Sequence, residues 1–330
     1  MKSIIIMSIL LISIFIVLSP VSAATYHVYP GNDIKAIIEG ATSGDTVYIH
    51  AGIYYPTGTI VVSGNPSIIG DSPFNTIIDF NTAGQGIDAS SQDGVTIKNI
   101  TVTNSTGAGI EVDEESTVEN CIVHGCTGPG FICDEDCTFK NCIAYDIGDD
   151  GFNCDDDCTF FNCLAYFNGD DGFQDSEECT YINCTAANNN DDGFYSMFGG
   201  SKYENCISFE NSGYGFYTNR TEGPLEIIYS NAWGNGQDNY DQGPDMGSIS
   251  VDPKFVDGIN TFYLSPSSPC VDKGSTSSAS LGLYQGFTTR TDGKWDTGTV
   301  DIGFHYKSNR GPPSSLPIAK ILKILKENKE

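Results

Sequence analysis

A glycine followed by a large apolar residue recurs along this chain at intervals of 21 to 23 residues. A period in this range is typical of stacked coils, in which each repeat is one supersecondary unit that packs on its neighbours. The repeat therefore predicts a solenoid. The glycines, each directly before Ile or Phe, are Gly86, Gly109, Gly130, Gly151, Gly172, Gly193 and Gly215.

The composition of the repeats indicates the kind of solenoid, and a second column of residues has the same period. The repeats contain short alternating runs such as 158–165, which are rich in strand formers and broken by Gly, Asn and Asp. A leucine-rich horseshoe has a similar period, but it requires Leu at most inward positions and a helical segment in each repeat. The pattern instead predicts an all-β fold, a parallel β-helix with three short strands per coil. The second column consists of Asn99, Asn120, Asn141, Asn162, Asn183 and Asn205.

Equivalent residues of successive coils are expected to stack at the ordinary strand spacing of about 4.8 Å. The column asparagines suit a sharp turn, where each side-chain amide can bond the next one and also satisfy turn backbone. Inward columns are expected at Ala144, Ala165 and Ala186 and at Phe131, Phe152, Phe173, Phe194 and Phe216.

The first residues look like a secretory signal peptide. Lys2 precedes an apolar run from about 4 to 18, and small residues up to Ala23 form a cleavage site. Residues 1–23 are therefore interpreted as a signal peptide, although an uncleaved membrane anchor is the alternative. This interpretation predicts a secreted or cell-surface protein.

The rest of the chain is expected to form one quasi-linear domain from 24 to 306, because the length of a repeat array does not indicate how many domains it forms. A short helix at 33–39 is expected to cap the open apolar end. The most regular coils are predicted at 86–220, and a loop-rich C-terminal closing layer is predicted at 221–306. Residues 307–317, with several prolines, read as a linker.

Residues 318–330 have the pattern of a basic amphipathic tail helix. Its apolar face would carry Ile318, Ile321, Leu322 and Leu325, with lysines between them. Three interpretations remain open: contact with a membrane surface through 318–329, docking on acidic coils of the same chain, or a frayed tail.

The chain has twelve cysteines, which in an exported protein would normally imply a disulfide framework. Most of them instead recur with the coil period, so they are interpreted as small apolar core residues. Disulfides between adjacent coils remain open. Zinc is less favoured, because no Cys-x-x-Cys pair occurs.

The net charge is −27, and the acidic residues are concentrated in one part of the chain. Between Glu111 and Asp192 there are 21 acidic residues and a single basic one, Lys140. Such a block makes nucleic acid an unsuitable partner, because a nucleic-acid-binding surface needs clustered cations.

The acidic residues fall into two columns when the coils are aligned on Gly-Phe. Like charges stacked about 4.8 Å apart repel by roughly 1 kcal/mol in water and more near a low-dielectric surface, so the paired column favours a bound cation. Oxygen-only ligands in an exported protein favour Ca²⁺, whereas a solvated acidic edge is the alternative. One column is 113–115, 134–136, 155–157 and 176–178; the other is Asp149, Asp150, Asp170, Asp171, Asp191 and Asp192.

The strings 141–152 and 162–173, both of the form Asn-Cys-x-Ala-Tyr-x-x-Gly-Asp-Asp-Gly-Phe, resemble the pectin-lyase-like superfamily and specifically its family 9 pectate lyases. The resemblance implies a right-handed, single-stranded parallel β-helix, calcium bound by an Asp-Asp-Gly-x-Asp motif, and a lysine base on a later coil. Carried over, the candidate metal ligands are Asp149, Asp150, Asp170, Asp171, Asp191, Asp192, Asn153 and Asp155.

The outward strand departs from the family at the position after Gly-Phe, where the family places an Asp and later a Lys. This chain has no lysine in that column, and the weak candidate for a catalytic base is Arg220, with Lys202 and Lys140 as further basic residues. The residues in the column, which are expected to bind substrate, are Asn153, Gln174, Tyr195 and Tyr217.

Three functional hypotheses follow. The first is an exported, monomeric, calcium-binding β-helix protein that acts on or binds acidic polysaccharide at the cell surface. The second is a calcium-dependent polysaccharide lyase of the pectate type, acting by β-elimination, which needs a base to remove the proton next to the carboxylate. The third is an adhesin or structural protein of the cell envelope.

Overall fold

The computed structural model describes residues 22–219, 223–241, 245–256 and 262–307. The predicted signal segment, apart from its last two residues, and the predicted tail helix lie outside these ranges. Within the described residues, no helix is long and apolar enough to cross a membrane.

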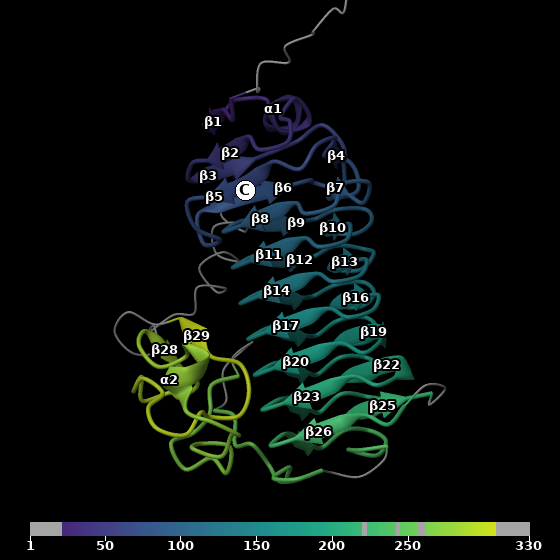
Figure 1. Cartoon of the computed structure of the whole chain (residues 1–330), viewed down its shortest axis with the longest axis vertical. Helices are drawn as coiled ribbons and strands as arrows, with labels where there is room; N and C mark the ends of the chain where they lie inside the picture. The colour runs from purple at the N-terminus through teal and green to yellow at the C-terminus, as the bar shows by residue number, and fades with distance from the viewer. Residues whose placement is uncertain (1–21, 220–222, 242–244, 257–261, 308–330) are drawn as a thin grey trace, which may run out of the picture.

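The chain winds into a right-handed parallel β-helix whose three strands per coil form three long parallel sheets, as predicted (Figure 1). Within the residues that the structure describes, sheet A has ten strands, which stack in chain order. They are β1 (Thr25–Val28), β2 (Thr46–Ile49), β5 (Ser67–Gly70), β8 (Thr96–Lys98), β11 (Thr117–Glu119), β14 (Thr138–Lys140), β17 (Thr159–Phe161), β20 (Thr180–Ile182), β23 (Lys202–Glu204) and β26 (Glu226–Ile228).

Sheet B follows sheet A in each coil and has nine strands in the described part of the chain. They are β3 (Gly52–Tyr54), β6 (Thr76–Asp79), β9 (Thr101–Thr103), β12 (Ile122–His124), β15 (Ile143–Tyr145), β18 (Leu164–Tyr166), β21 (Thr185–Ala187), β24 (Ile207–Phe209) and β27 (Asn231–Trp233).

Sheet C completes the coil, and eight of its strands lie in the described ranges. They are β4 (Ile60–Val61), β7 (Ile87–Ala89), β10 (Ile110–Val112), β13 (Phe131–Cys133), β16 (Phe152–Cys154), β19 (Phe173–Glu177), β22 (Phe194–Gly199) and β25 (Phe216–Thr218). The register pairs each residue with its equivalent one coil away, for example Asn153 with Gln174.

The core is built from columns of like residues, because every coil presents the same positions inward. Phe131, Phe152, Phe173, Phe194 and Phe216 form one fully buried stack, with successive ring centroids 4.7 to 4.9 Å apart. The predicted phenylalanine stack is thus confirmed. The predicted alanine column of sheet B is also buried.

The glycine before each phenylalanine is required by a close approach of backbones. A Cβ atom added at Gly130, Gly151 or Gly172 would lie 2.5 to 2.7 Å from the carbonyl oxygen of the equivalent glycine in the next coil. The regular glycine spacing in the sequence therefore reflects the narrow distance between coils at this turn.

The predicted asparagine column lies at the turn between sheets A and B. Its members have left-handed backbone, with φ between 53° and 59°, a conformation that Asn tolerates better than most residues. The side-chain amide of Asn120 donates to Asn99 at 3.2 Å, that of Asn141 to Asn120 at 3.2 Å, and that of Asn162 to Asn141 at 2.8 Å.

A second asparagine ladder, buried except at its last member, leads up to sheet C and was missed by the sequence reasoning. Asn168 donates to Asn189, Asn189 to Asn211, and Asn211 to Asn235, at 2.8 to 3.0 Å. The spacing of these residues, close to one coil, was the signal that could have identified it.

All twelve cysteines are free thiols and are buried, which fits the interpretation as small core residues. The sulfur atoms of Cys133 and Cys158 lie 3.5 Å apart, a contact distance rather than a bond. The cysteines of the Asn-Cys strings donate their S–H groups to backbone carbonyls, as Cys142 does to Val118.

The ends of the solenoid differ from each other. Helix α1 (Ile34–Glu39) lies at the N-terminal end and buries Ile34 and Ile38 in the main core (Figure 1). At the other end, β26 and β27 continue the regular coils beyond residue 220, within the range where a closing layer was expected.

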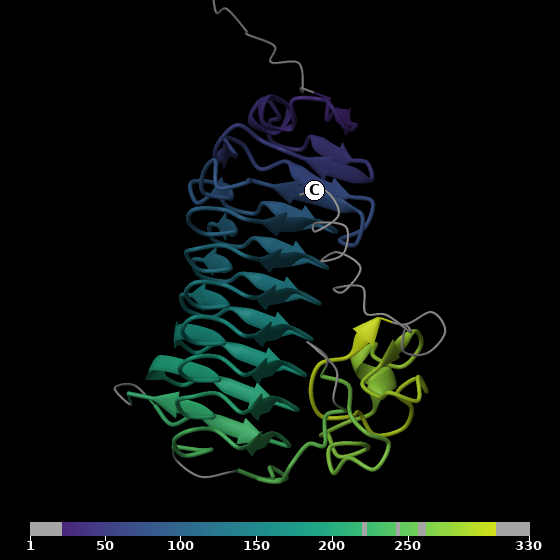
Figure 2. The ribbon, with the colours of Figure 1, turned by 180° about the vertical axis from the view of Figure 1, so that it is seen from behind.

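Residues 262–307, here called the C-terminal strap, do not stack on the end of the solenoid but lie alongside its last coils (Figure 2). The strap contains α2 (Ser278–Leu281) and the antiparallel pair β28 (Phe287–Thr288) and β29 (Tyr306–Lys307). It binds the asparagine column directly, because the amide of Asn183 donates to the carbonyl oxygens of Asp301 and Gly303 at 2.8 and 3.2 Å.

Candidate metal centre on sheet C

The paired aspartates lie at the turn that leads into the strands of sheet C, one pair in each of three successive coils. The second member of each pair, Asp150, Asp171 or Asp192, is at most 6% exposed, whereas Asp170 and Asp191 are exposed. Each coil therefore presents one buried and one outer carboxyl group at the same edge.

The buried aspartates are held by backbone N–H groups of the next coil. Asp150 Oδ1 accepts from the N–H of Asp171 at 3.0 Å, and Asp171 Oδ1 accepts from the N–H of Asp192 at 2.7 Å. Asp192 Oδ1 accepts in turn from the N–H of Tyr214 at 2.5 Å. The Asn153 amide also donates to Asp150 Oδ2 at 2.8 Å, which leaves the carboxyl groups fixed in position.

Burial raises the pKa of these carboxyl groups far above that of a free aspartate. The pKa is raised to about 7 for Asp150, about 9 for Asp171 and about 7 for Asp192, and the neighbouring carboxylates add to the effect. Burial and the adjacent carboxylates also raise the pKa of Asp170. Ionising the column in the absence of a cation is therefore unfavourable.

Within the aspartate column, two groups of three carboxylates have ligand oxygens that all lie within 4.8 Å of one another. One group is Asp149, Asp150 and Asp170; the other is Asp170, Asp171 and Asp191. Asp170 belongs to both. Donor sets made only of carboxylate oxygens fit a hard cation such as Ca²⁺ and do not suit soft metals.

The remaining predicted ligands are placed differently. Asp192 belongs to neither group, although it continues the same column. Asn153 contacts the first group through Asp150. Asp155 lies beyond the other end of β16, where its Oδ1 accepts from the Ser176 hydroxyl at 3.1 Å.

The predicted binding column runs along the outer face of sheet C beside the aspartates. Asn153, Gln174, Tyr195 and Tyr217 are neighbours in register and are partly exposed. The rings of Tyr195 and Tyr217 stack with centroids 5.5 Å apart.

Tyr214 extends this aromatic surface and was missed by the sequence reasoning. Its ring stacks on Tyr217 with centroids 4.5 Å apart. The signal was available, since Tyr214 stands directly before Gly215-Phe216, the position that Asp192 occupies one coil earlier. The aspartate column thus ends in an aromatic residue.

The described strands of sheet C contain no lysine or arginine. Lys140 lies on β14 of sheet A, with its ammonium group 5.6 Å from the centre of the Phe161 ring. Lys202 lies on β23 of the same sheet and pairs with Glu204 at 3.2 Å. Arg220, the weak candidate for a base, lies outside the described residues.

The stacked coils and the aspartate column define a pectate-lyase-like right-handed parallel β-helix protein. The chain belongs to the family described as Pel9A-like, right handed beta helix region, whose sequence model matches residues 21–248. This match covers the described coils from β1 to β27 and includes every aspartate of the column.

The structure is similar to that of pectate lyase Pel9A, with a TM-score of 0.58 and 16% sequence identity over 87% of this chain and 96% of that one. A weaker similarity, with a TM-score of 0.45 and 18% identity, relates 62% of this chain to 66% of the A-module of the Azotobacter vinelandii mannuronan C-5 epimerase AlgE4. At 16% identity, the comparison with pectate lyase Pel9A shows the fold alone. No curated protein sequence matches the chain significantly.

Proposed function

We propose that this is an exported protein that binds acidic polysaccharide at the cell surface through calcium held by the aspartate column. The observation that carries the proposal is the sharing of Asp170 between two compact groups of carboxylates. The buried members of these groups have strongly raised pKa values, so a divalent cation would stabilise their ionised form. Asp149, Asp150, Asp170, Asp171 and Asp191 would hold the ions.

The neighbouring surface suits a sugar chain. A bound cation can be coordinated at the same time by protein carboxylates and by carboxylates of a uronic acid polymer. The aromatic surface beside the aspartates consists of Tyr195, Tyr217 and Tyr214. A tyrosine ring can pack on the apolar face of a ligand while its hydroxyl group remains available for a hydrogen bond. The pectate lyase to which this fold is similar is named for an acidic polysaccharide.

Affinity electrophoresis in gels containing polygalacturonate or alginate, with calcium or with a chelator, tests this function. We expect retardation that requires calcium and is lost in Asp170→Asn. Asp157→Asn is the matched control, because it removes an exposed carboxylate at a left-handed position that Asn tolerates. Retardation that is the same with calcium and with chelator would contradict the proposal.

β-Elimination by a pectate-type lyase is the second candidate, favoured by the match to the Pel9A-like family. Calcium would stabilise the charge that develops when the proton next to the uronate carboxylate is removed, and a base would still be required. The assay is the absorbance of unsaturated uronate on polygalacturonate with calcium. We expect little or no turnover; activity that Arg220→Ala abolishes would establish a lyase.

Export and monomeric state belong to the same proposal. Signal-peptide cleavage after Ala23 predicts a mature N-terminus at Ala24, which N-terminal sequencing of the protein from culture medium or envelope fractions would test. A cell-envelope adhesin would use the same scaffold, and it would be recognised by retention of the protein on cells in the presence of a chelator.

A further inference from the structure

The outer face of sheet B is apolar, unlike a typical solvent-exposed face. The first outward column contains Ile122, Ile143 and Leu164, all at most 8% exposed. The corresponding outward positions of sheet A carry polar and charged residues such as Lys98 and Glu119. An apolar outer face over several coils requires a covering element.

The C-terminal strap covers part of this face. Phe262, Tyr263, Phe304 and Tyr306 of the strap form one apolar cluster with residues of sheet B that include Leu164 and Tyr166. Phe262 contacts the Tyr166 ring with centroids 5.2 Å apart.

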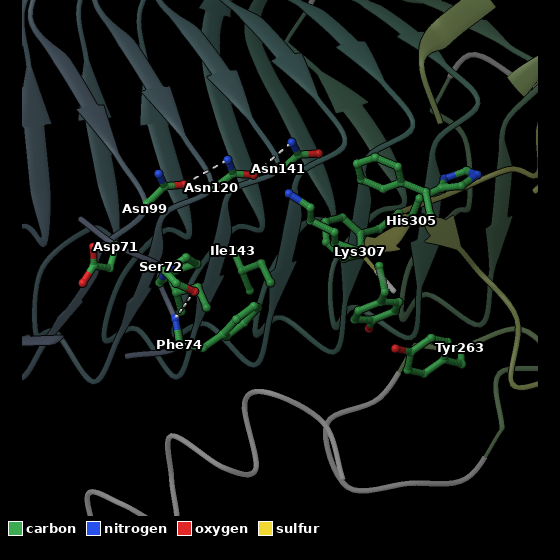
Figure 3. Close-up of a pocket in the computed structure, with 15 residues that line it drawn as sticks. Asp71, Ser72, Phe74, Asn99, Asn120, Asn141, Ile143, Tyr263, His305 and Lys307 are labelled. Carbon is green, nitrogen blue, oxygen red and sulfur yellow. Dashed lines mark hydrogen bonds between the residues drawn. The ribbon is translucent and has the colours of Figure 1, made fainter. Parts of the chain in front are cut away.

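A cavity of about 430 Å³ lies where the strap ends (Figure 3). Apolar side chains from three separate parts of the chain line it, and the amides of Asn99, Asn120 and Asn141 follow one edge. Because both apolar side chains and polar amides line it, the cavity is suited to an amphipathic segment. The apolar lining residues include Phe74, Ile122, Ile143, Tyr263, Phe304 and Tyr306.

The second outward column of the same face has buried polar atoms that lack partners. His124, Tyr145 and Tyr166 stack on successive coils, with ring centroids 4.7 and 5.0 Å apart. The Nε2 atom of His124 and both tyrosine hydroxyl groups have no hydrogen-bond partner among the described residues. Unpaired buried polar atoms are costly, so a further group is expected to complete this face.

The last described residues of the strap run along the asparagine column toward the cavity. Successive strap residues bond successive column asparagines, with Gly303 at Asn183 and His305 at Asn162. Lys307, the last described residue, lines the cavity together with Asn141, the next column residue. Each step moves the strap toward the N-terminal coils, so the strap has reached the cavity at Lys307.

We propose that residues 318–326 dock as an amphipathic helix on the outer face of sheet B, beside the cavity. Ile318, Ile321, Leu322 and Leu325 would contact the apolar column. The ten preceding residues can span up to about 33 Å, or about seven coil spacings, so they reach any of these coils.

Charge also favours a site on the same chain. Residues 318–330 carry four lysines and two glutamates, whereas the whole protein has a net charge of −27. Lysine ammonium groups can donate hydrogen bonds to the hydroxyl oxygens of Tyr145 and Tyr166.

Hydroxyl-radical footprinting of the full chain and of a variant that ends at Lys307 tests the docking. We expect Tyr145 to be labelled several-fold faster in the truncated variant. Tyr181 in the core should stay protected in both proteins, and Tyr55, which is 58% exposed, should be labelled in both. These two residues report whether truncation has disturbed the solenoid.

Point variants keep the chain at full length. Leu322→Gln should increase labelling of Tyr145, whereas Lys323→Gln, on the opposite helix face, should leave it protected. Equal labelling of Tyr145 in the full and truncated chains would overturn the proposal. Protection of Tyr145 that depends on protein concentration would assign the face to a second copy. Labelling of residues 318–326 in the full chain that falls on addition of anionic phosphatidylglycerol vesicles would assign the tail to membranes.

Discussion

Asn162 and His305 are separated by 143 residues and exchange two hydrogen bonds. The Asn162 amide donates to the carbonyl oxygen of His305 at 2.9 Å, and the N–H of His305 donates to Asn162 Oδ1 at 2.6 Å. Asn162 therefore belongs to the turn of a central coil and also holds the C-terminal strap in place.

Asn162→Ala is expected to loosen the strap and lower the free energy of unfolding by about 1–3 kcal/mol more than Asn120→Ala does. Both substitutions remove a left-handed asparagine and ladder hydrogen bonds, but only Asn162 contacts the strap. Urea unfolding measures both. Equal losses in the two variants would show that the strap contact adds nothing to stability.

Phe173→Ala is expected to cost about 3–5 kcal/mol, because it leaves a cavity in the middle of the fully buried ring stack. Phe198→Ala is the control, since the Phe198 side chain is exposed. Thermal and urea unfolding should separate the two variants clearly. A small effect at Phe173 would mean that the neighbouring rings collapse into the space.

Asp175 gives a pH-dependent contribution to stability. It is buried in the core, where burial raises its pKa to about 6 although the hydroxyl groups of Ser196, Ser201 and Tyr181 donate to it. A raised carboxyl pKa means that the folded protein binds the proton more tightly. The contribution is therefore fully present below the unfolded pKa of about 3.9 and is lost as the pH rises through 6.

Compared with Asp175→Asn, the wild type should thus lose about 2 kcal/mol of stability between pH 4 and pH 7. The neutral amide provides the pH-independent reference, and urea unfolding at each pH measures the difference. A difference between wild type and variant that is constant over this range would contradict a titrating Asp175.

Calcium at about one hundred times its dissociation constant should stabilise the protein by about 2.7 kcal/mol, because it binds the folded state only. A chelator should remove this gain. Asp170→Asn should abolish most of the effect, since Asp170 belongs to both carboxylate groups, whereas Asp157→Asn should keep it. A melting temperature indifferent to calcium and to chelator would exclude the metal centre.

The coils could be predicted from the sequence because each column repeats the same residue type, as Phe152, Phe173 and Phe194 do. The grouping of Asp149, Asp150 and Asp170 followed from the same alignment, since neighbours in a column are neighbours in space. Periodicity thus carries both the fold and the position of the candidate site.

Other contacts could not be predicted because they have no period. The strap binds Asn162 and Asn183 through backbone groups, which any sequence offers. Asp175 replaces a cysteine in an inward column, and only the surrounding hydroxyl groups of adjacent coils explain how a carboxyl group is accepted there.

The close approach of the coils at Gly151 and Gly172 has a consequence for changes in chain length. Inserting one whole coil of 21 residues would preserve every column, whereas any other insertion within a strand would shift phenylalanine, glycine and aspartate out of alignment. The strap limits where such a duplication can occur. It could lengthen the protein on the N-terminal side of Asn162, but between Asn162 and Asn205 it would separate anchor points that His305 and Ser275 must reach together.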